Sequence, residues 1–314
     1  MTRQVNNQSR RDILKVCSSI SLSAVGALPA FALRDGEPSL TAILSALQRA
    51  AHQILERPLV FQDPLALKII GDHGFGEIKT NLNYHREPTV RFLRAALVAR
   101  SRFTEDELSA AYARGIRQYI VLGAGLDTFA YRNPYHDLSV FEVDDYVTQL
   151  WKRKALEDSG IEIPGTLQFV SVDFERQVLG DRLREAGFQF DRPVFVSWLG
   201  VTMYLTPEAV LSTLAAIAKQ CSNDSAIVFD YLLPAGELSY SENISRTLFS
   251  IEMERIGEPW ISQFNSAELG ASLRRMGYSS MHFIGADQIN VRYFSNRSDG
   301  FMVRGSSRLL QVKI

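Results

Sequence analysis

Two glycines that follow an apolar run are the residues best suited to hold a small molecule. The run Tyr119–Leu122 is apolar, and Gly123 and Gly125 come directly after it. A buried parallel strand that ends in a tight glycine turn brings its backbone to the mouth of a cofactor crevice. We therefore expect Gly123 and Gly125 to let the backbone approach a cofactor, with Asp127 in the same turn.

A second apolar run ends in acid. Phe141–Asp144 carries Glu142 and Asp144, and Glu142 lies about seventeen residues after Gly125, near the spacing at which an acidic side chain binds ribose hydroxyls. Side chains two residues apart share one face of a strand. The pattern favours an adenosine-type cofactor and leaves open which of the two acids contacts the ribose.

The residue at the third small position of the fingerprint, Thr128, distinguishes between kinds of cofactor. A dinucleotide fingerprint requires a small residue where Thr128 stands, and the chain contains no G-x-x-x-x-G-K-[ST] phosphate loop. A cofactor without a pyrophosphate needs only the first two glycines, and S-adenosylmethionine fits this description. The alternatives are a nicotinamide-dependent oxidoreductase and a non-catalytic protein that binds an adenosyl ligand.

Five motifs, in this order, resemble those of the bacterial S-adenosylmethionine-dependent methyltransferases related to leucine carboxyl methyltransferases. They are Val121–Arg132, Phe141–Asp144, Val172–Phe174, Ser197–Leu205 and Gly257–Trp260. The likeness spans about Pro38 to the C-terminus, and it implies O-methylation of a carboxylate or hydroxyl on a small molecule or peptide end. Relatives often carry Glu where Leu199 stands, so no role of that carboxylate is transferred to this chain.

The elements that position these motifs alternate between strand and helix from Gln118 onward. We predict strands near 118–122, 139–143, 167–172, 194–199, 226–231, 280–285 and 308–313. This order predicts an α/β fold with a doubly wound, mostly parallel sheet. Seven strands with a terminal hairpin, the Rossmann-like class I methyltransferase sheet, are what the resemblance implies. Ligands of such sheets bind at the carboxyl ends of the strands, where Gly123, Glu142, Asp173 and Gly200 fall.

Further cofactor contacts are expected on both sides of the glycine turn. Asp173 would accept a hydrogen bond from the adenine amine, with Phe174 against the ring, although Asp173 also suits a helix N-cap. The resemblance suggests that Arg100 or Arg102 pairs with the cofactor carboxylate; a solvated helix face is the alternative for both.

The sequence says less about the residues that bind the methyl acceptor. Methyl transfer from a sulfonium is an in-line displacement, so the protein must align the reacting atoms in a dry site. Tyr204, after the fourth predicted strand, is the candidate catalytic residue that lines the pocket, or else a buried packing residue. Trp260 and Arg132 are candidate substrate contacts, against packing for Trp260 and a helix-end charge for Arg132.

Helical patterns precede the first strand. They cover Leu40–Leu55, a helix that opens at Asp63–Leu65, Thr89–Arg102 and Glu105–Arg114. We therefore divide the chain into an N-terminal segment (1–32), a helical cap (33–114) that covers the crevice, and a cofactor-binding catalytic domain (115–314).

The first 32 residues resemble a twin-arginine export signal. Ser9–Lys15 matches the twin-arginine pattern, a mildly apolar stretch follows, and Ala30–Ala32 is an A-x-A cleavage site. This predicts export to the periplasm through the twin-arginine machinery, whereas the cytosolic supply of S-adenosylmethionine favours the cytoplasm. The apolar stretch is too short for stable membrane insertion.

Composition excludes several other classes. The 314 residues carry a net charge of −1, so no nucleic-acid partner is expected. Cys17 and Cys221 cannot build a disulfide framework, and the five histidines show no metal-ligand spacing.

Overall fold

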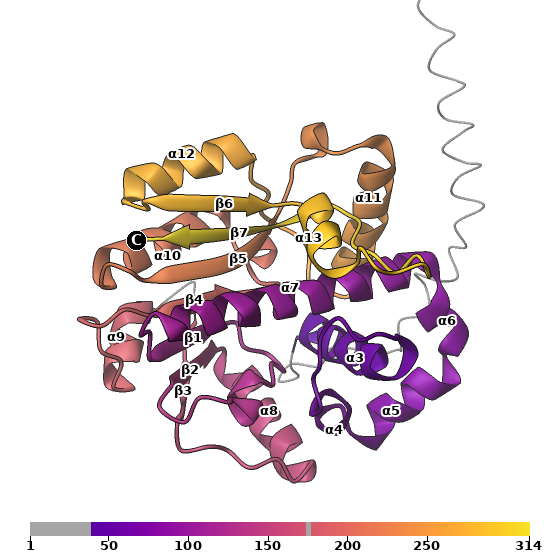
Figure 1. Ribbon diagram of the computed structural model, residues 1–314, viewed down its shortest axis with the longest axis horizontal. Helices are drawn as coiled ribbons and strands as arrows, with labels where there is room; N and C mark the ends of the chain where they lie inside the picture. The colour runs from indigo at the N-terminus through magenta and orange to yellow at the C-terminus, as the bar shows by residue number, and fades with distance from the viewer. Residues whose placement is uncertain (1–38, 174–176) are drawn as a thin grey trace, which may run out of the picture.

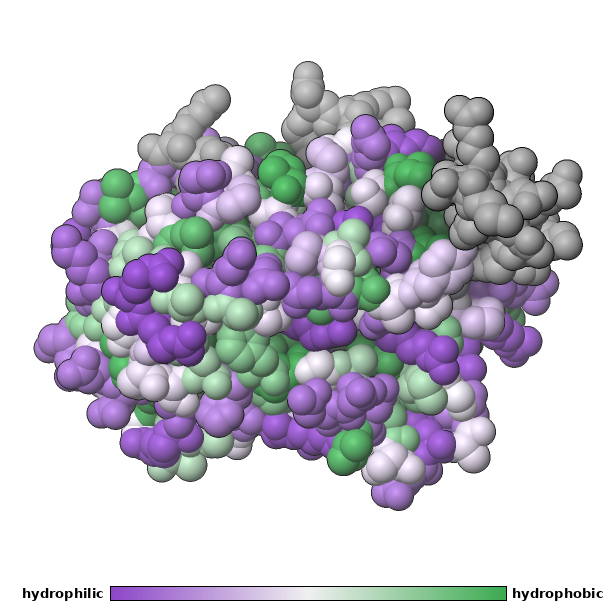
Figure 2. Space-filling view, turned by 90° about the horizontal axis from the view of Figure 1, so that it is seen from above, coloured by the Kyte–Doolittle hydropathy of each residue, from purple (hydrophilic) through white to green (hydrophobic). Residues whose placement is uncertain are grey.

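The computed structural model describes residues 39–173 and 177–314 (Figure 1). The predicted export signal, residues 1–32, and Phe174 lie outside these ranges and stay predictions. No helix of the described ranges has the length and apolarity needed to cross a membrane. On the face seen in Figure 2, apolar residues are scattered among hydrophilic ones.

A seven-stranded sheet forms the centre of the molecule, as predicted. Its order is β3-β2-β1-β4-β5-β7-β6; the first five strands are parallel and β7 is antiparallel to both neighbours. The strands are β1 (Gln118–Leu122), β2 (Ser139–Asp144), β3 (Leu167–Ser171), β4 (Phe195–Trp198), β5 (Ala226–Leu232), β6 (Ser280–Ile284) and β7 (Ser307–Lys313). The chain reverses its direction across the sheet between β1 and β4, which is where such folds bind ligands.

Helices cover both faces of the sheet, as Figure 1 shows. Alternation along β1 illustrates why: Val121 belongs to an apolar cluster with Phe103 on one face, and Leu122 to a cluster with Leu214 on the other. Strands that are apolar on both faces require this double cover. The first face carries α7 (Pro88–Ala113) and α13 (Ala286–Tyr293); the second carries α9 (Leu179–Glu185), α10 (Pro207–Gln220) and α12 (Ser266–Met276).

Six further α-helices complete the described part of the fold. They are α3 (Leu40–Leu55), α4 (Ala66–Ile69), α5 (Gly71–Thr80), α6 (Leu82–Arg86), α8 (Tyr146–Asp158) and α11 (Tyr240–Arg255). The helices α3 to α5 share a small core of their own, which includes Leu47, Ala50 and Ile78.

One predicted division between helices was wrong. The helices expected at 89–102 and 105–114 are one helix, α7, because no Gly or Pro interrupts the run after Pro88. Thr104, which lies between the two predicted helices, is buried in the middle of α7. The glycine turn leads into a single 3₁₀ turn, Phe129–Arg132, which ends before Asn133–Pro134.

Candidate active site

A cavity of about 1130 Å³ opens at the carboxyl ends of the parallel strands. Its walls are the turns after β1, β2 and β4, the helices α3, α7 and α11, and the segment that follows α11. The predicted site residues that line it are Arg100, Gly123, Gly125, Asp127, Asp144, Asp173, Gly200, Tyr204 and Trp260. Drug-sized ligands occupy pockets of roughly 300–1,000 Å³, so this cavity has room for two reactants.

The turn after β1 has a backbone that only glycine adopts readily. Gly123 and Gly125 have φ of 63° and 43°. A Cβ at Gly123 would lie 2.2 Å from a methyl carbon of Val201, and one at Gly125 would lie 3.1 Å from Cβ of Ala42. The two glycines therefore let the turn pack against both the β4 turn and α3.

The two acids of β2 have separate environments. Asp144, at the strand end, lines the cavity, and its carboxylate accepts hydrogen bonds from the N–H groups of Gly125 (2.6 Å) and Asp145 (2.7 Å). Burial raises the pKa of Asp144 above its ordinary value, against the effect of those two hydrogen bonds. Asp144 thus fixes the glycine turn. Asp145, which the sequence reasoning did not single out, also lines the cavity and caps α8 through the N–H of Val147.

Glu142 does not reach the cavity. It is fully buried, and Lys152 Nζ lies 2.7 Å from its Oε2, to which the hydroxyl of Tyr131 also donates a hydrogen bond (3.1 Å). Burial raises the pKa of Glu142 to about 7, although the Lys152 ammonium acts in the opposite direction. Strands on both sides enclose Glu142, whereas Asp144 lies at the open end, so sharing a strand face does not give both acids access to a ligand.

An ion pair between Arg100 and Asp230 lies next to the turn that follows β4. Arg100 Nη1 donates to Asp230 Oδ2 (2.8 Å), and the N–H of Gly200 donates to Asp230 Oδ1 (2.6 Å). Gly200 has φ of 72°, and a Cβ there would lie 2.6 Å from Arg100 Nη2, so glycine makes room for the guanidinium. Arg102 instead pairs with Asp106 on an exposed face. Of the two predicted arginines, Arg100 is therefore the one that lines the cavity.

Asp230 is a cavity residue that the sequence reasoning missed. A signal was present, because Asp230 is an acid near the end of an otherwise apolar strand, as Glu142 and Asp144 are.

The acceptor side is built around Tyr204. Trp260 Nε1 donates a long hydrogen bond (3.4 Å) to its hydroxyl, and Met253 Sδ of α11 lies 4.0 Å from the same oxygen. Burial raises the pKa of the Tyr204 phenol, so the hydroxyl keeps its proton at neutral pH. Leu199 also lines the cavity, with an apolar side chain.

Glu258 forms hydrogen bonds with the first turn of α3, next to the cavity. Its carboxylate accepts hydrogen bonds from the N–H of Leu40 (2.6 Å) and from the hydroxyls of Thr41 (2.5 Å) and Ser39 (3.0 Å). A carboxylate at a helix N-terminus is favoured by the helix dipole and the free N–H groups there. No local pattern in the sequence joins Glu258 to residues more than 200 positions away.

The other predicted residues differ in their surroundings. Arg132 is not part of the cavity lining; its guanidinium pairs with Glu105 (Nη1 to Oε2, 2.8 Å) and lies 3.6 Å from Asp63. Asp127 accepts a hydrogen bond from the N–H of Phe129 (2.8 Å). The backbone N–H of Asp173 donates to the side chain of Gln177 (3.0 Å).

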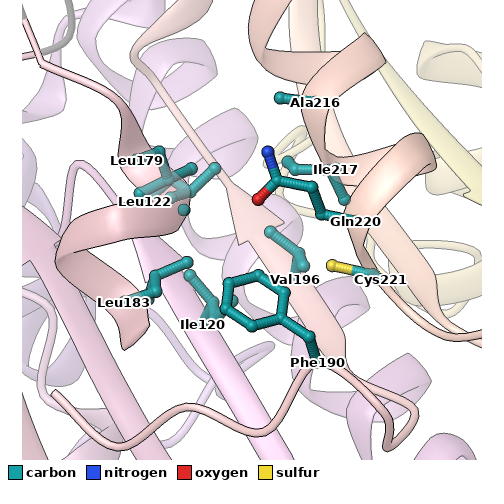
Figure 3. A pocket seen from close by; sticks show the side chains of 11 residues that line it. Ile120, Leu122, Leu179, Leu183, Phe190, Val196, Ala216, Ile217, Gln220 and Cys221 are labelled. Atoms are coloured by element: carbon teal, nitrogen blue, oxygen red, sulfur yellow. The ribbon is translucent and has the colours of Figure 1, made fainter. Parts of the chain in front are cut away.

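A second cavity, of about 20 Å³, lies between the sheet and the helices α9 and α10 (Figure 3). Aliphatic and aromatic side chains such as Val196 and Phe190 surround it, and the amide of Gln220 and the thiol of Cys221 are the polar groups. This volume suffices for one water at most. Burial raises the pKa of the Cys221 thiol to about 12, so that thiol is unreactive and the small cavity is a packing void.

Comparison with known proteins identifies the family. The profile described as leucine carboxyl methyltransferase matches residues 42–218. YktD of Bacillus subtilis (strain 168), provisionally named an S-adenosyl-L-methionine-dependent methyltransferase, is 33% identical over 292 residues, which cover 85% of this chain and 95% of YktD. Rv3399 of Mycobacterium tuberculosis, with the same provisional name, is 31% identical over 196 residues, which are 60% of this chain and 56% of Rv3399.

Solved structures agree on the fold. A provisionally assigned methyltransferase from Thermobifida fusca superposes with a TM-score of 0.57 at 16% identity, covering 91% of this chain and 98% of that one. The family profile spans more than half of the chain, and YktD matches it nearly end to end. This chain belongs to the leucine carboxyl methyltransferase family and is a methyltransferase.

Proposed function

We propose that this enzyme transfers the methyl group of S-adenosylmethionine to a carboxylate oxygen of its acceptor. The observation that carries the proposal is the composition of the large cavity: its lining, within the described residues, contains no His, Lys or Cys. A hydroxyl acceptor needs a base or a lowered pKa, whereas a carboxylate is already ionised at neutral pH.

The acids of the lining support the same choice, because each one near the acceptor side already has partners. Asp230 pairs with Arg100, Glu258 caps α3, and Glu252 pairs with Arg255 through bonds of 3.0 Å. None of these carboxylates is placed to remove a proton from a hydroxyl without breaking the contact that holds an element of the site.

The residues present fit S-adenosylmethionine. Gly123 and Gly125 allow close backbone approach, and Arg100 presents a cation of which one nitrogen is held by Asp230. In this proposal Arg100 binds the cofactor carboxylate, Asp144 or Asp145 accepts hydrogen bonds from the ribose hydroxyls, and Asp173 contacts the adenine. When bound, the cofactor supplies an electrophilic methyl group on a sulfonium.

The chain's own task is then alignment and exclusion of water. Tyr204 keeps its proton and can donate a hydrogen bond to the acceptor carboxylate, which holds the other oxygen toward the methyl group. Leu199, Met203 and Trp260 surround this position with apolar area. Family membership favours this methyltransferase over the nicotinamide-dependent and non-catalytic alternatives.

The test is the chemical stability of the product. The full-length protein is incubated with methyl-tritiated S-adenosylmethionine and matched pairs of carboxylic acids and the corresponding alcohols. We expect label in the acid products, released as volatile methanol by mild alkali, which hydrolyses methyl esters. Alkali-stable label confined to the alcohols would overturn the carboxylate proposal while leaving the methyltransferase assignment intact.

A further inference from the structure

Arg246 is a cation of the large cavity that the proposed mechanism does not use. It lies on the face of α11 that lines the cavity, with Glu242, Phe249 and Met253. These positions are separated by three or four residues and therefore share one side of the helix.

One nitrogen of the Arg246 guanidinium, Nε, lacks a partner within the described residues. This nitrogen is buried, and no described carboxylate forms an ion pair with Arg246. The other cavity arginines are engaged: Arg49 with Asp63, Arg100 with Asp230, and Arg304 over the ring of Phe92. Leaving a buried donor unpaired costs free energy, which an anionic ligand would offset.

Neighbouring acids do not supply that anion. Glu242, one turn before Arg246, accepts the hydroxyl of Ser239 (2.7 Å) and lies 3.7 Å from Arg308. Glu252 is held by Arg255. Both carboxylates are thus directed to other cations or caps.

Arg246 is also far from the site of methyl transfer. Met253 lies beside Tyr204, and Arg246 is seven residues earlier on the same helix, roughly 10 Å along its axis at about 1.5 Å per residue. Helical side chains tend to point toward the N-terminus of the helix, which for Arg246 is the direction away from Met253. This separation along α11 leaves room for two different groups of one ligand to contact the two residues. The lining between and around them includes Phe249, Leu93 and Leu97, which are apolar.

We propose that the acceptor is an amphipathic molecule with an apolar body and a second anionic group, and that Arg246 binds this second group. A planar guanidinium binds a carboxylate or phosphate through two parallel hydrogen bonds. This inference rests on the proposed function, since it names the substrate class of the same site, and it makes Arg246 a specificity-determining residue.

The first experiment measures anion binding without catalysis. Anilinonaphthalene sulfonate has an apolar body and one anionic group, and N-phenylnaphthylamine is its uncharged counterpart; both fluoresce in apolar cavities. Each is titrated into the full-length protein and into Arg246→Gln, Arg246→Lys and Arg275→Gln. The last variant removes an exposed arginine of α12 and is the matched control.

We expect Arg246→Gln to weaken binding of the sulfonate about tenfold, as for loss of a charge-assisted hydrogen bond, and to leave the uncharged probe unchanged. Arg246→Lys should retain most of the affinity, and Arg275→Gln should match the wild type. Equal sulfonate affinity in Arg246→Gln and wild type, or failure of the sulfonate to bind the wild type, would overturn the inference. Thermal melts of all variants verify that folding is intact.

A methyl-transfer assay distinguishes failure of this inference from failure of the proposed function. Methyl transfer is assayed with α,ω-dicarboxylic acids of increasing length and with their monoamides. We expect the diacids to have a lower KM than the monoamides in wild type, and Arg246→Gln to abolish that difference with kcat little changed. Methyl-ester formation without such a preference would refute Arg246 recognition alone. Absence of any ester, together with Arg246-dependent sulfonate binding, would refute the carboxylate proposal alone.

Discussion

At the scale of single residues, Gly125 tests whether the glycine turn is the cofactor cradle. Its φ of 43° and the 3.1 Å separation from Ala42 mean that Gly125→Ala strains the backbone and also crowds α3. Gly160 is a matched control, because its φ is 61° and no atom lies within 4 Å of an added Cβ. Both variants should lose about 1–2 kcal/mol of stability from left-handed strain. Only Gly125→Ala should lose affinity for S-adenosylhomocysteine in calorimetry. Equal affinities of the Gly125→Ala and Gly160→Ala proteins would mean that the glycine turn does not contact the cofactor.

Substitutions of Asp144 and Glu142, the two acids of β2, should affect different properties of the protein. Asp144→Asn weakens a carboxylate that holds the glycine turn and faces the cavity, so S-adenosylhomocysteine affinity should fall by about 1–3 kcal/mol. Glu142→Gln keeps the volume of a buried side chain that does not line the cavity, so the affinity of the folded protein should be unchanged and any loss should appear in folding stability. Calorimetry and urea melts measure the two effects. A stable Glu142→Gln protein with weakened cofactor binding would return the ribose role to Glu142.

These residues also show what the sequence could predict. The glycine turn and Asp144 follow from a strand that ends in residues with special backbone or charge, and this is a local pattern. The burial of Glu142 depends on Lys152 from the next helix and on two flanking strands, and the ion pair of Arg132 depends on Glu105. Such partners come from tertiary packing, which a local pattern does not contain.

At the scale of elements, α3 should depend on Glu258. Replacing this residue with alanine removes the acceptor for the N–H of Leu40 and for two hydroxyls, so the first turn of α3 should open more often. We expect hydrogen exchange of Leu40–Ala42 to accelerate about tenfold or more, the equivalent of one lost charge-assisted bond.

Glu268→Ala is the control for that experiment. Glu268 is also an acid in a helix first turn, that of α12, but Asn265 caps that helix through the N–H groups of Ala267 and Glu268. Its loss should leave exchange in α3 unchanged. If Glu258→Ala likewise leaves α3 protected, α3 is held by its apolar face and not by the segment after α11.

Elements differed in how far local sequence determines them. Every predicted strand agrees with the structure to within one residue at each end, because each is a short apolar run between turn residues. The helix α7 was predicted as two helices, Thr89–Arg102 and Glu105–Arg114, although no helix breaker separates them. Phe103 and Leu108, on either side of Thr104, belong to one core cluster. Their shared burial favours a continuous helix across Thr104.

At the scale of the whole molecule, the buried pair Glu142–Lys152 should make stability depend on pH. Burial raises the pKa of Glu142 from 4.5 to about 7. Between these values the native state retains a proton that the unfolded chain has lost. Because the native state then binds more protons, the free energy of unfolding contributed by Glu142 falls as pH rises from about 4.5 to about 7.

A second buried group acts in the opposite direction and must be separated from it. Burial, with a smaller effect from Arg94, lowers the pKa of His52 from 6.5 to about 3, so the unfolded state binds more protons there and stability rises with pH across that range. The wild-type slope sums these two contributions and those of other shifted groups such as Asp144. The double variant Glu142→Gln with Lys152→Met keeps His52 and removes the titrating pair, and similar side-chain volumes should preserve packing.

Urea melts at several pH values between 4.5 and 7.5 then isolate the Glu142 contribution as the difference between wild type and double variant. We expect the stability of the wild type relative to the double variant to decline as pH rises, and to level off above about pH 7, where Glu142 is ionised in both states. A difference that does not change with pH would mean that Lys152 keeps Glu142 ionised throughout. Glu142 and Lys152 would then form a permanent ion pair, and binding of S-adenosylhomocysteine would show no dependence on the protonation of Glu142.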